Sequence, residues 1–286
     1  MLVCIILSNS AIIISPRISV ALHFQYVALM TELIHDPDAF RPDKYPLLSF
    51  PEPTWQWFLQ ACQDLEITVG EEKRLILERF YSHLLGVNAW LNLTRLTTAE
   101  EYLKFHVFDS LTVLNLVQEL SDPGDIILDL GSGGGYPGLP LLTWLPDRHF
   151  VLLDSRRKKV TFLQQTLTLL PADQKAEAVC FRGREVSAYR PDLHNQCSLV
   201  VARAVGKAAE ILLDSGELLR AGGHCIMLKG PNFITAEGDE FADACRKLDF
   251  ELQDIHPIAL DENDQDRYVV VSRRKAIKTI RTHKRH

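Results

Sequence analysis

A run of glycines follows a short apolar stretch near the middle of the chain, and its residue types suit the binding of a ligand. Ile126-Ile127-Leu128 leads directly into Asp129-Leu130-Gly131-Ser132-Gly133-Gly134-Gly135-Tyr136-Pro137-Gly138. Glycine lets the backbone approach a ligand closely, and open α/β sheets bind ligands at the carboxyl ends of their strands. A glycine run alone is a weak signal, because it also forms tight turns.

An acid follows at the spacing that suits ribose recognition. Asp154 ends the next apolar run and lies 19 residues after Gly135. At an offset of ~20 residues a carboxylate accepts hydrogen bonds from ribose hydroxyls. The alternative is that Asp154 caps the N-terminus of the following helix, and one residue can serve both roles. We therefore predict a cofactor that contains adenosine.

Two cofactors fit these residues. Gly133 to Gly138 matches the dinucleotide pattern G-x-G-x-x-G, in which a helix N-terminus meets a pyrophosphate. In this chain Pro137 and Pro140 move the helix start further along, and Asp129 places a carboxylate before the loop. The carboxylate of Asp129 would repel a pyrophosphate, whereas the sulfonium-bearing methionine of S-adenosylmethionine tolerates a nearby carboxylate. Methyltransferases also use the pattern D-x-G-x-G-x-G. We favour S-adenosylmethionine, with an NAD(P)-binding oxidoreductase as the alternative.

The spacing of apolar residues predicts the elements that hold this loop. From Pro123 on, short apolar runs alternate with helical segments, which is typical of a parallel sheet with crossover helices. We predict strands over 126–130, 150–153, 178–182, 199–202 and 224–228, helices over 159–170 and 207–219, and an antiparallel pair over 250–257 and 267–272 joined by an acidic turn over 261–266. Gly222-Gly223 is interpreted as the stop signal of the second helix.

The chain before the sheet is predicted to be helical. Residues 54–65 and 71–85 repeat apolar positions at helical spacing. A third helix runs to about Leu120 and starts where Thr97 or Thr98 forms a capping box with Glu100 or Glu101. The predicted parts are a leader over 1–46, a helical extension over 47–120, a doubly wound, Rossmann-like α/β methyltransferase domain over 121–272 and a basic tail over 273–286. Translation from Met30 is an open hypothesis for the leader.

Charge is distributed unevenly along the chain. The formal net charge is −6, yet residues 273–286 contain seven Lys or Arg and no acid. A basic arm on an acidic body is typical of contact with a polyanion such as nucleic acid, and also of a solvated tail. Composition alone leaves both interpretations open.

Cysteine usage and hydropathy indicate a cytoplasmic protein. The six cysteines are scattered, with no C-x-x-C pair and no histidine at ligand spacing, so we expect reduced thiols and no metal site. No apolar run approaches the ~20 residues of a membrane span. The first positive residue, Arg17, follows the N-terminal apolar stretch rather than preceding it, which argues against an export signal.

About residues 80–272 resemble the 16S ribosomal RNA guanine-N7 methyltransferase family, also called glucose-inhibited division protein B. Besides the glycine loop, the similar segments are Trp90-Leu91-Asn92-Leu93-Thr94, His106-Val107-Phe108-Asp109-Ser110, Leu153-Asp154-Ser155, Arg203-Ala204 and Leu228-Lys229-Gly230. The Asn-Leu-Thr and His-x-x-Asp-Ser segments are not general methyltransferase features, so they identify the family. The resemblance implies S-adenosylmethionine as cofactor and 16S ribosomal RNA or the small ribosomal subunit as partner.

The resemblance also implies roles for individual residues. The residues expected around the cofactor are Gly131, Gly133, Tyr136, Asp154, Ser155, Arg156, Glu185, Val186 and Arg203. Glu185 and Val186 are expected beside the adenine. Arg203 and Lys229 are the candidate catalytic residues, and an ion pair with a nearby acid is the alternative for each. His106 and Asp109, a helical turn apart, are interpreted as a buried hydrogen-bonded pair.

The sequence lacks the motifs of enzymes that methylate exocyclic amines or cytosine C5, which agrees with methylation of guanine N7. N7 carries an exposed lone pair and needs no general base, so orientation is the chief contribution to the rate. Val201-Ala202-Arg203-Ala204 stands where enzymes that methylate exocyclic amines place Asn or Asp before Pro-Pro-aromatic. No cysteine has the setting of a cytosine-C5 nucleophile. We predict a monomeric guanine-N7 methyltransferase, with a non-catalytic RNA-binding protein on the same fold as the remaining alternative.

Overall fold

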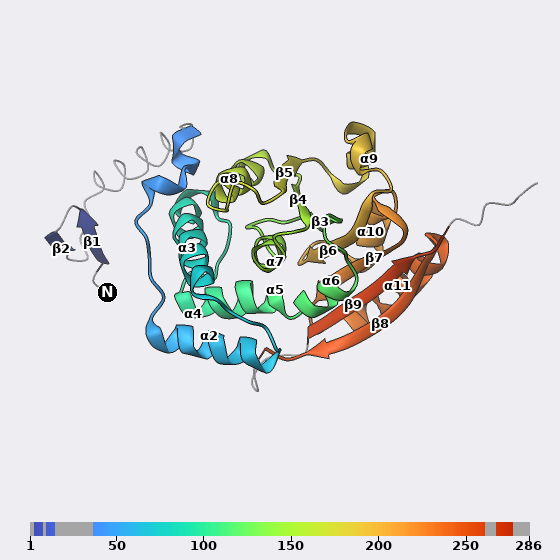
Figure 1. Cartoon of the computed structure of the whole chain (residues 1–286), viewed down its shortest axis with the longest axis horizontal. Coiled ribbons are helices and arrows are strands. Elements are labelled where there is room, and N and C mark those ends of the chain that lie inside the picture. Colours follow the sequence, from blue (N-terminus) through green and yellow to red (C-terminus); the bar gives the residue numbers. More distant parts are fainter. Residues whose placement is uncertain (1–2, 8–9, 15–36, 261–266, 277–286) are drawn as a thin grey trace, which may run out of the picture.

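A mixed β-sheet forms the centre of the computed structural model, which describes residues 3–7, 10–14, 37–260 and 267–276 (Figure 1). Its strand order is β5-β4-β3-β6-β7-β9-β8. The strands are β3 (Ile126–Leu130), β4 (His149–Asp154), β5 (Ala176–Cys180), β6 (Cys197–Arg203), β7 (Leu219–Lys229), β8 (Phe250–Ile258) and β9 (Arg267–Arg274). Strands β3 to β7 are parallel, and β9 runs antiparallel between β7 and β8. The predicted doubly wound α/β fold is therefore confirmed, and the predicted turn over 261–266 lies outside the described residues.

Helices cover both faces of this sheet because its strands are apolar on both faces. Side chains alternate along a strand, so Ile127 packs into the core on one face and Leu128 into the core on the other. The first face is covered by α2 (Glu52–Asp64), α3 (Glu71–Leu91), α5 (Asp109–Leu111), α6 (Leu114–Glu119), α7 (Gly138–Trp144) and α8 (Arg157–Leu167). The second face is covered by α9 (Val186–Tyr189), α10 (Ala208–Ser215) and α11 (Phe233–Lys247).

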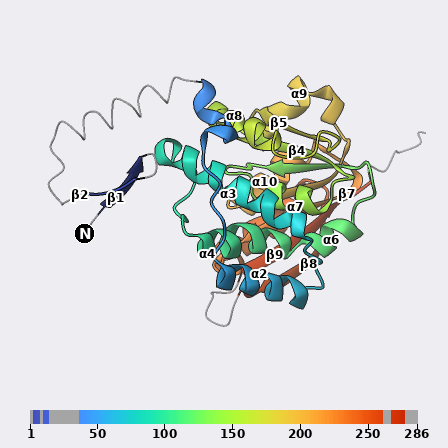
Figure 2. The ribbon, with the colours of Figure 1, turned by 60° about the vertical axis from the view of Figure 1, so that its left-hand side comes forward.

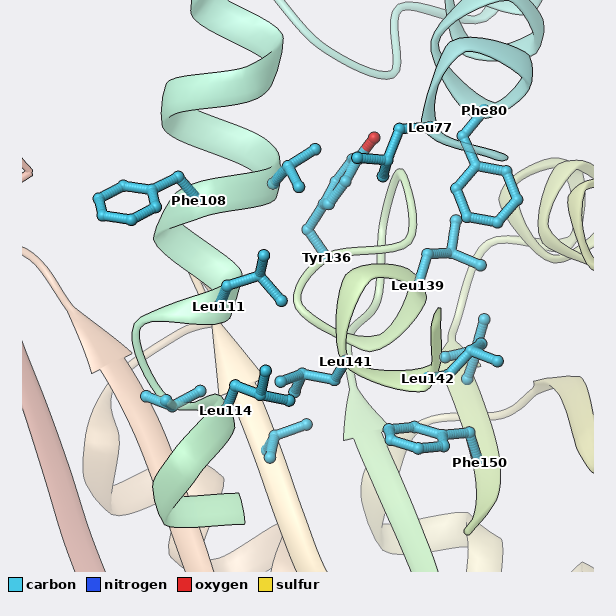
Figure 3. Packing of buried hydrophobic residues seen from close by; sticks show 14 of the residues in the cluster. Leu77, Phe80, Phe108, Leu111, Leu114, Tyr136, Leu139, Leu141, Leu142 and Phe150 are labelled. Carbon is cyan, nitrogen blue, oxygen red and sulfur yellow. The ribbon is translucent and has the colours of Figure 1, made fainter. Parts of the chain in front are cut away.

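The N-terminal helices share one hydrophobic core with the sheet. Figure 2 shows α2 to α6 along one side of the sheet, and in Figure 3 Leu111 and Leu114 point toward Leu141 of α7. The core also includes Phe40, which lies in η1 (Pro37–Phe40) and is 6% exposed. The packed body therefore begins before residue 47, where the predicted extension starts.

The third predicted helix contains an irregular segment. Thr98 and Glu101 form the capping box of α4 (Ala99–Glu101), as predicted, and the chain then continues as the π-helix η3 (Tyr102–Phe108). After α5 the helix is interrupted at Thr112 and Val113 before α6. Among the described helices, none is long and apolar enough to cross a membrane.

Two sequence predictions near the end of the sheet were wrong. Helix α10 ends at Ser215, and Gly222-Gly223 lies inside β7 instead of stopping a helix. Cys197 pairs with Leu219 and Leu199 pairs with His224, so residues 220–223 form a bulge, which φ +80° at Gly222 permits.

Strand β9 also runs further than predicted. It extends to Arg274, so Arg273 and Arg274 belong to the sheet and not to the basic tail. Near the N-terminus, β1 (Val3–Leu7) pairs antiparallel with β2 (Ser10–Ile14). Met30 lies outside the described residues.

Candidate functional site

The predicted site residues gather at the carboxyl edge of the parallel strands. Strand β3 has β4 on one side and β6 on the other, so the direction of strand succession reverses at β3. Ligands of open α/β sheets bind at such a reversal. The glycine loop follows β3, Asp154 ends β4, Arg203 ends β6 and Lys229 ends β7.

The glycine loop is held close to the segment that follows β6. Gly131 has φ +75°, a conformation that favours glycine. A Cβ atom at Gly131 would lie 2.3 Å from Cγ2 of Val205. Any other residue at Gly131 would therefore push the loop away from Val205.

Asp154 fixes the loop from the end of β4. Its Oδ2 accepts a hydrogen bond from the Gly133 amide (3.1 Å), and its Oδ1 accepts one from the Arg156 amide (2.8 Å). The alternative role as helix cap was wrong, because Arg156 occupies the N-cap position of α8. Each carboxylate oxygen accepts more than one hydrogen bond, so Asp154 can hold the loop and a ligand together.

A cavity of 510 Å³ opens beside Asp154. Of the residues predicted to bind the cofactor, Gly131, Asp154, Ser155 and Glu185 line it. Sequence reasoning missed further lining residues, among them Phe181, Val205, Glu210 and Asp214. Arg156 and Val186 are not among the lining residues, and Val186 is fully buried in the core on the second face of the sheet.

A smaller cavity of 230 Å³ continues along the glycine loop and also contains Gly131 in its wall. The predicted residues Gly133, Tyr136 and Arg203 line it. Lys159 from α8 lines it as well, with Nζ 3.9 Å from Oδ2 of Asp154. Lys159 belongs to the basic segment 156–159, which the sequence places directly after Asp154 and which was interpreted either as part of a positive face around the cofactor or as a solvated helix start.

Arg203 is bound tightly to the π-helix and the short helix after it. Its Nη1 donates to the carbonyl of Phe105 (2.7 Å) and to Oδ2 of Asp109 (2.7 Å), and its Nη2 lies 3.2 Å from Nδ1 of His106. His106 and Asp109 were predicted to bond to each other, but both bond to Arg203. The ion pair is buried, with side chains 14% and 4% exposed for Arg203 and Asp109.

His106 is a neutral member of this network. Arginine can only donate, so Nδ1 of His106 accepts, and Nε2 donates to Oγ1 of Thr94 at 2.8 Å. Burial and the nearby Arg203 lower the pKa of His106 to about 3. Its ring stacks on Tyr136 at a centroid distance of 4.4 Å. The hydrogen bond between Thr94 and His106 thus joins two of the family-like segments, 90–94 and 106–110.

Asp129 faces the core instead of the ligand cavities. It is fully buried, its Oδ2 accepts from the Gly138 amide (2.9 Å), and burial raises its pKa to about 7. A Cβ at Gly138 would lie 2.6 Å from that oxygen. The argument that Asp129 would repel a pyrophosphate is therefore unsupported. The other argument against a dinucleotide agrees with the structure, because the helix after the loop starts late, at Gly138, with Pro137 as its N-cap.

Lys229 forms the ion pair that was its alternative role. Its Nζ lies 2.9 Å from Oε2 of Glu237 and donates to the carbonyl of Gly206 (3.0 Å). Its side chain is 9% exposed. Lys229 lines a third cavity beyond Arg203 rather than the two that contain Gly131.

The comparison with known proteins decides the family. The model of the GidB family, described as rRNA small subunit methyltransferase G, matches residues 73–265. The chain belongs to this family. The match to rRNA small subunit methyltransferase G begins inside α3 and includes the glycine loop and the carboxyl ends of all the parallel strands. The resemblance drawn from the motifs is confirmed.

Individual relatives agree with the family model. The ribosomal RNA small subunit methyltransferase G of Gloeobacter violaceus is 35% identical over 197 residues, which cover 69% of this chain and 76% of the relative. The protein of that name from Coxiella burnetii is 33% identical and covers 60% of this chain and 78% of its own. The one from Lachnoclostridium phytofermentans is 29% identical, with coverages of 74% and 86%.

Proposed function

We propose that this chain transfers the methyl group of S-adenosylmethionine to N7 of a guanine in 16S ribosomal RNA. Membership of the rRNA small subunit methyltransferase G family supports a methyltransferase that acts on ribosomal RNA. The observation that carries the proposal is the pair of neighbouring cavities on either side of Gly131, one lined by Asp154 and the other by the glycine loop and Arg203. The predicted cytoplasmic location and monomeric state remain predictions.

The larger cavity fits an adenosine chemically. Ribose hydroxyls and an exocyclic amine are donors, and the cavity wall contains the acceptors Asp154, Glu185, Glu210 and Asp214. Phe181 and Val205 add apolar surface, and Gly131 lets the backbone approach closely. We assign Asp154 to the ribose hydroxyls and Glu185 to the adenine. When bound, S-adenosylmethionine supplies an electrophilic methyl group on sulfur.

The residues near Arg203 suit a reaction without a general base. Guanine N7 attacks with its own lone pair, so no proton has to leave the base. Both ring nitrogens of His106 are occupied by Thr94 and Arg203, which leaves no histidine base at this point. Hydrogen bonds to Asp109 and to the Phe105 carbonyl hold Arg203 in place. We infer that Arg203 forms the part of the cavity wall against which the guanine is aligned.

The test is transfer of labelled methyl from S-adenosylmethionine to unmethylated small-subunit ribosomal RNA or particles. One guanine should be labelled, and borohydride with aniline should then cleave the RNA there, because N7 methylation makes the ring cationic and labile. Arg203→Ala should lose most of this activity while remaining folded, and the exposed Arg246→Ala should keep it. Label on cytosine, on an exocyclic amine or only on protein contradicts the proposal.

A further inference from the structure

A group of exposed cations lies where β4 and β5 end, on the other side of β3 from the strand that carries Arg203. We call them the rim cations, and they are Arg156, Arg157, Lys158 and Arg182. The segments that follow the two strands are in contact, because Sγ of Cys180 lies 3.7 Å from the carbonyl oxygen of Ser155. The rim cations therefore form one surface at the mouth of the larger cavity, whose wall includes Ser155 and Arg182.

None of the rim cations has a partner within the part of the chain that the structure describes. Their guanidinium and ammonium groups make no ion pair and donate no hydrogen bond there. Two neighbouring cations differ in this respect, since Lys159 pairs with Asp154 (3.9 Å) and Arg184 donates to Asp214 (3.1 Å). Lys159 and Arg184 are therefore left out of the group, and the charge of the rim cations is uncompensated.

The position of these charges is unfavourable for the fold itself. Arg157 and Lys158 occupy the first turn of α8, which contains no acid. The N-terminus of a helix carries a partial positive charge, so cations destabilise it and an anion stabilises it. The whole chain has a net charge of −6, so the rim cations do not reflect a basic composition. An anionic ligand would offset both the mutual repulsion of the rim cations and the helix dipole.

An exposed aromatic ring belongs to the same surface. Tyr189 ends α9 and is 68% exposed, which is the highest value among the large apolar side chains of the described residues. Its ring stacks on that of Phe181, with the centroids 5.4 Å apart and the planes 11° apart. Phe181 directly precedes Arg182 and lines the larger cavity. The two stacked rings thus extend from the cavity wall to the solvent, where Tyr189 presents most of its ring.

We propose that the rim cations and Tyr189 bind an unpaired stretch of the RNA substrate, apart from the guanine that is methylated. The proposal rests on the proposed function, because it takes ribosomal RNA as the ligand. Phosphates supply the anions for the rim cations, and an unpaired base stacks on Tyr189, which is how proteins commonly hold single strands. An RNA duplex offers the phosphates but no free base face. The surface therefore fits a single strand better than a duplex.

The double variant Arg157→Gln with Lys158→Gln tests the charges. Loss of two phosphate contacts should lower the slope of log affinity against log salt by about 1.4, at about 0.7 for each contact with single-stranded RNA. Filter binding of unmethylated small-subunit RNA measures the slope. The matched control is Lys175→Gln with Lys247→Gln, which removes the same charge from two exposed lysines outside this surface and should keep the wild-type slope.

Tyr189→Ala tests the stacking independently of charge. Loss of one stacked base should weaken the affinity for RNA by about 5- to 150-fold. The loss should appear as a higher KM with kcat within about twofold of the wild type, because the surface lies away from the reacting atoms. Tyr189→Phe keeps the ring and should bind RNA like the wild type. Calorimetry with S-adenosylmethionine is the second measurement, since Phe181 lines the cofactor cavity.

The outcomes separate this proposal from the proposed function. An unchanged salt slope in the Arg157/Lys158 variant, or an equal change in the Lys175/Lys247 control, overturns the role of the rim cations. A loss of S-adenosylmethionine affinity in Tyr189→Ala that matches its loss of RNA affinity assigns the ring to the cofactor site instead. Polyglutamate that binds the wild type as tightly as a single-stranded oligoribonucleotide of equal charge assigns the surface to an acidic protein. A wild type that binds RNA through this surface but methylates no guanine N7 overturns only the proposed function.

Discussion

Asp109 is a nearly buried carboxylate that holds two arginines from distant parts of the chain. Arg203 ends β6 and Arg267 begins β9, and both bond to Asp109 on the helix after η3. A buried ion costs several kcal/mol in desolvation unless it is paired. The two arginines together occupy both carboxylate oxygens of Asp109, so the buried charge is paired on each oxygen.

Asp154→Ala should weaken the binding of S-adenosylmethionine by about 1.5 to 3 kcal/mol, the range for hydrogen bonds to a charged group. The cost includes the loss of the Gly133 contact, which holds the loop in place. Isothermal calorimetry measures the affinity, and Asp173→Ala, which removes an exposed acid, is the control. Unchanged affinity for S-adenosylmethionine in a folded Asp154→Ala protein rejects the ribose assignment. Tight binding of NADH by the wild type would instead favour an oxidoreductase.

Buried histidines should make the fold sensitive to acid. Burial lowers the pKa of His83 to about 4, and the ring contacts Thr166 and the Phe40 carbonyl. An unfolded histidine titrates near ~6.5, so between pH 6.5 and 4 the unfolded chain binds a proton that the folded chain does not. The free energy of unfolding therefore falls as the pH drops through this window, by about 2 kcal/mol at pH 5 for His83.

Urea unfolding at pH 7 and pH 5 measures this effect. His83→Gln has no ring to protonate, so its free energy of unfolding should fall less between the two pH values than that of the wild type. His106, whose pKa is lowered to about 3, should add a similar loss in both proteins. Equal pH dependence of the wild type and His83→Gln would exclude His83 as a source of the acid sensitivity.

The π-helix is the element that brings the site together. Helical residues three and four apart share one face, and in η3 and α5 the Phe105 carbonyl, the His106 ring and the Asp109 carboxylate accordingly all bond to Arg203. Irregular helical segments of this kind are frequent at functional sites. The capping box fixes where this segment begins, since α4 ends where η3 starts.

Thr98→Ala should lower the free energy of unfolding by about 1 kcal/mol, because it removes the acceptor of the Glu101 amide. In a protein of this size the midpoint of thermal unfolding should fall by roughly 2 to 4 °C. The matched control is Thr235→Ala in the first turn of α11, where the threonine hydroxyl donates to the Asn232 carbonyl. A thermal shift no larger than that of the control would mean that the capping box contributes nothing measurable.

Local patterns predicted the elements better than the contacts between them. The strand over 126–130 and the Thr98 cap were predicted from apolar runs and capping residues, which are local signals. The β7 bulge was missed because two glycines signal a helix stop as readily as a bulge. The contact between Arg267 and Asp109 was missed, since the two residues lie 158 apart in the chain and no spacing in the sequence encodes their proximity.

At the scale of the whole molecule, the first two arginines of the basic C-terminus belong to the sheet. Arg274 donates from Nη1 to the Asn195 side chain and to the Leu219 carbonyl, and Nε of Arg273 donates to the Gly222 carbonyl. Both arginines therefore hold β9 against neighbouring segments. Lys275 is exposed, and residues 277–286 lie outside the described residues. The RNA hypothesis for the tail thus concerns the residues from 275 on.

Deleting residues 275–286 should weaken RNA binding and flatten its dependence on salt. The deletion keeps β9 complete and removes Lys275, Lys278, Arg281, Lys284 and Arg285. Each phosphate contact that is lost should lower the slope of log affinity against log salt by about 0.7 for single-stranded RNA, because fewer counterions are released. Filter binding between 50 and roughly 200 mM salt measures the slope. The control changes the same five residues to glutamine at full length, which separates charge from length. If both proteins keep the wild-type slope while remaining folded, the tail makes no phosphate contacts and is only solvated.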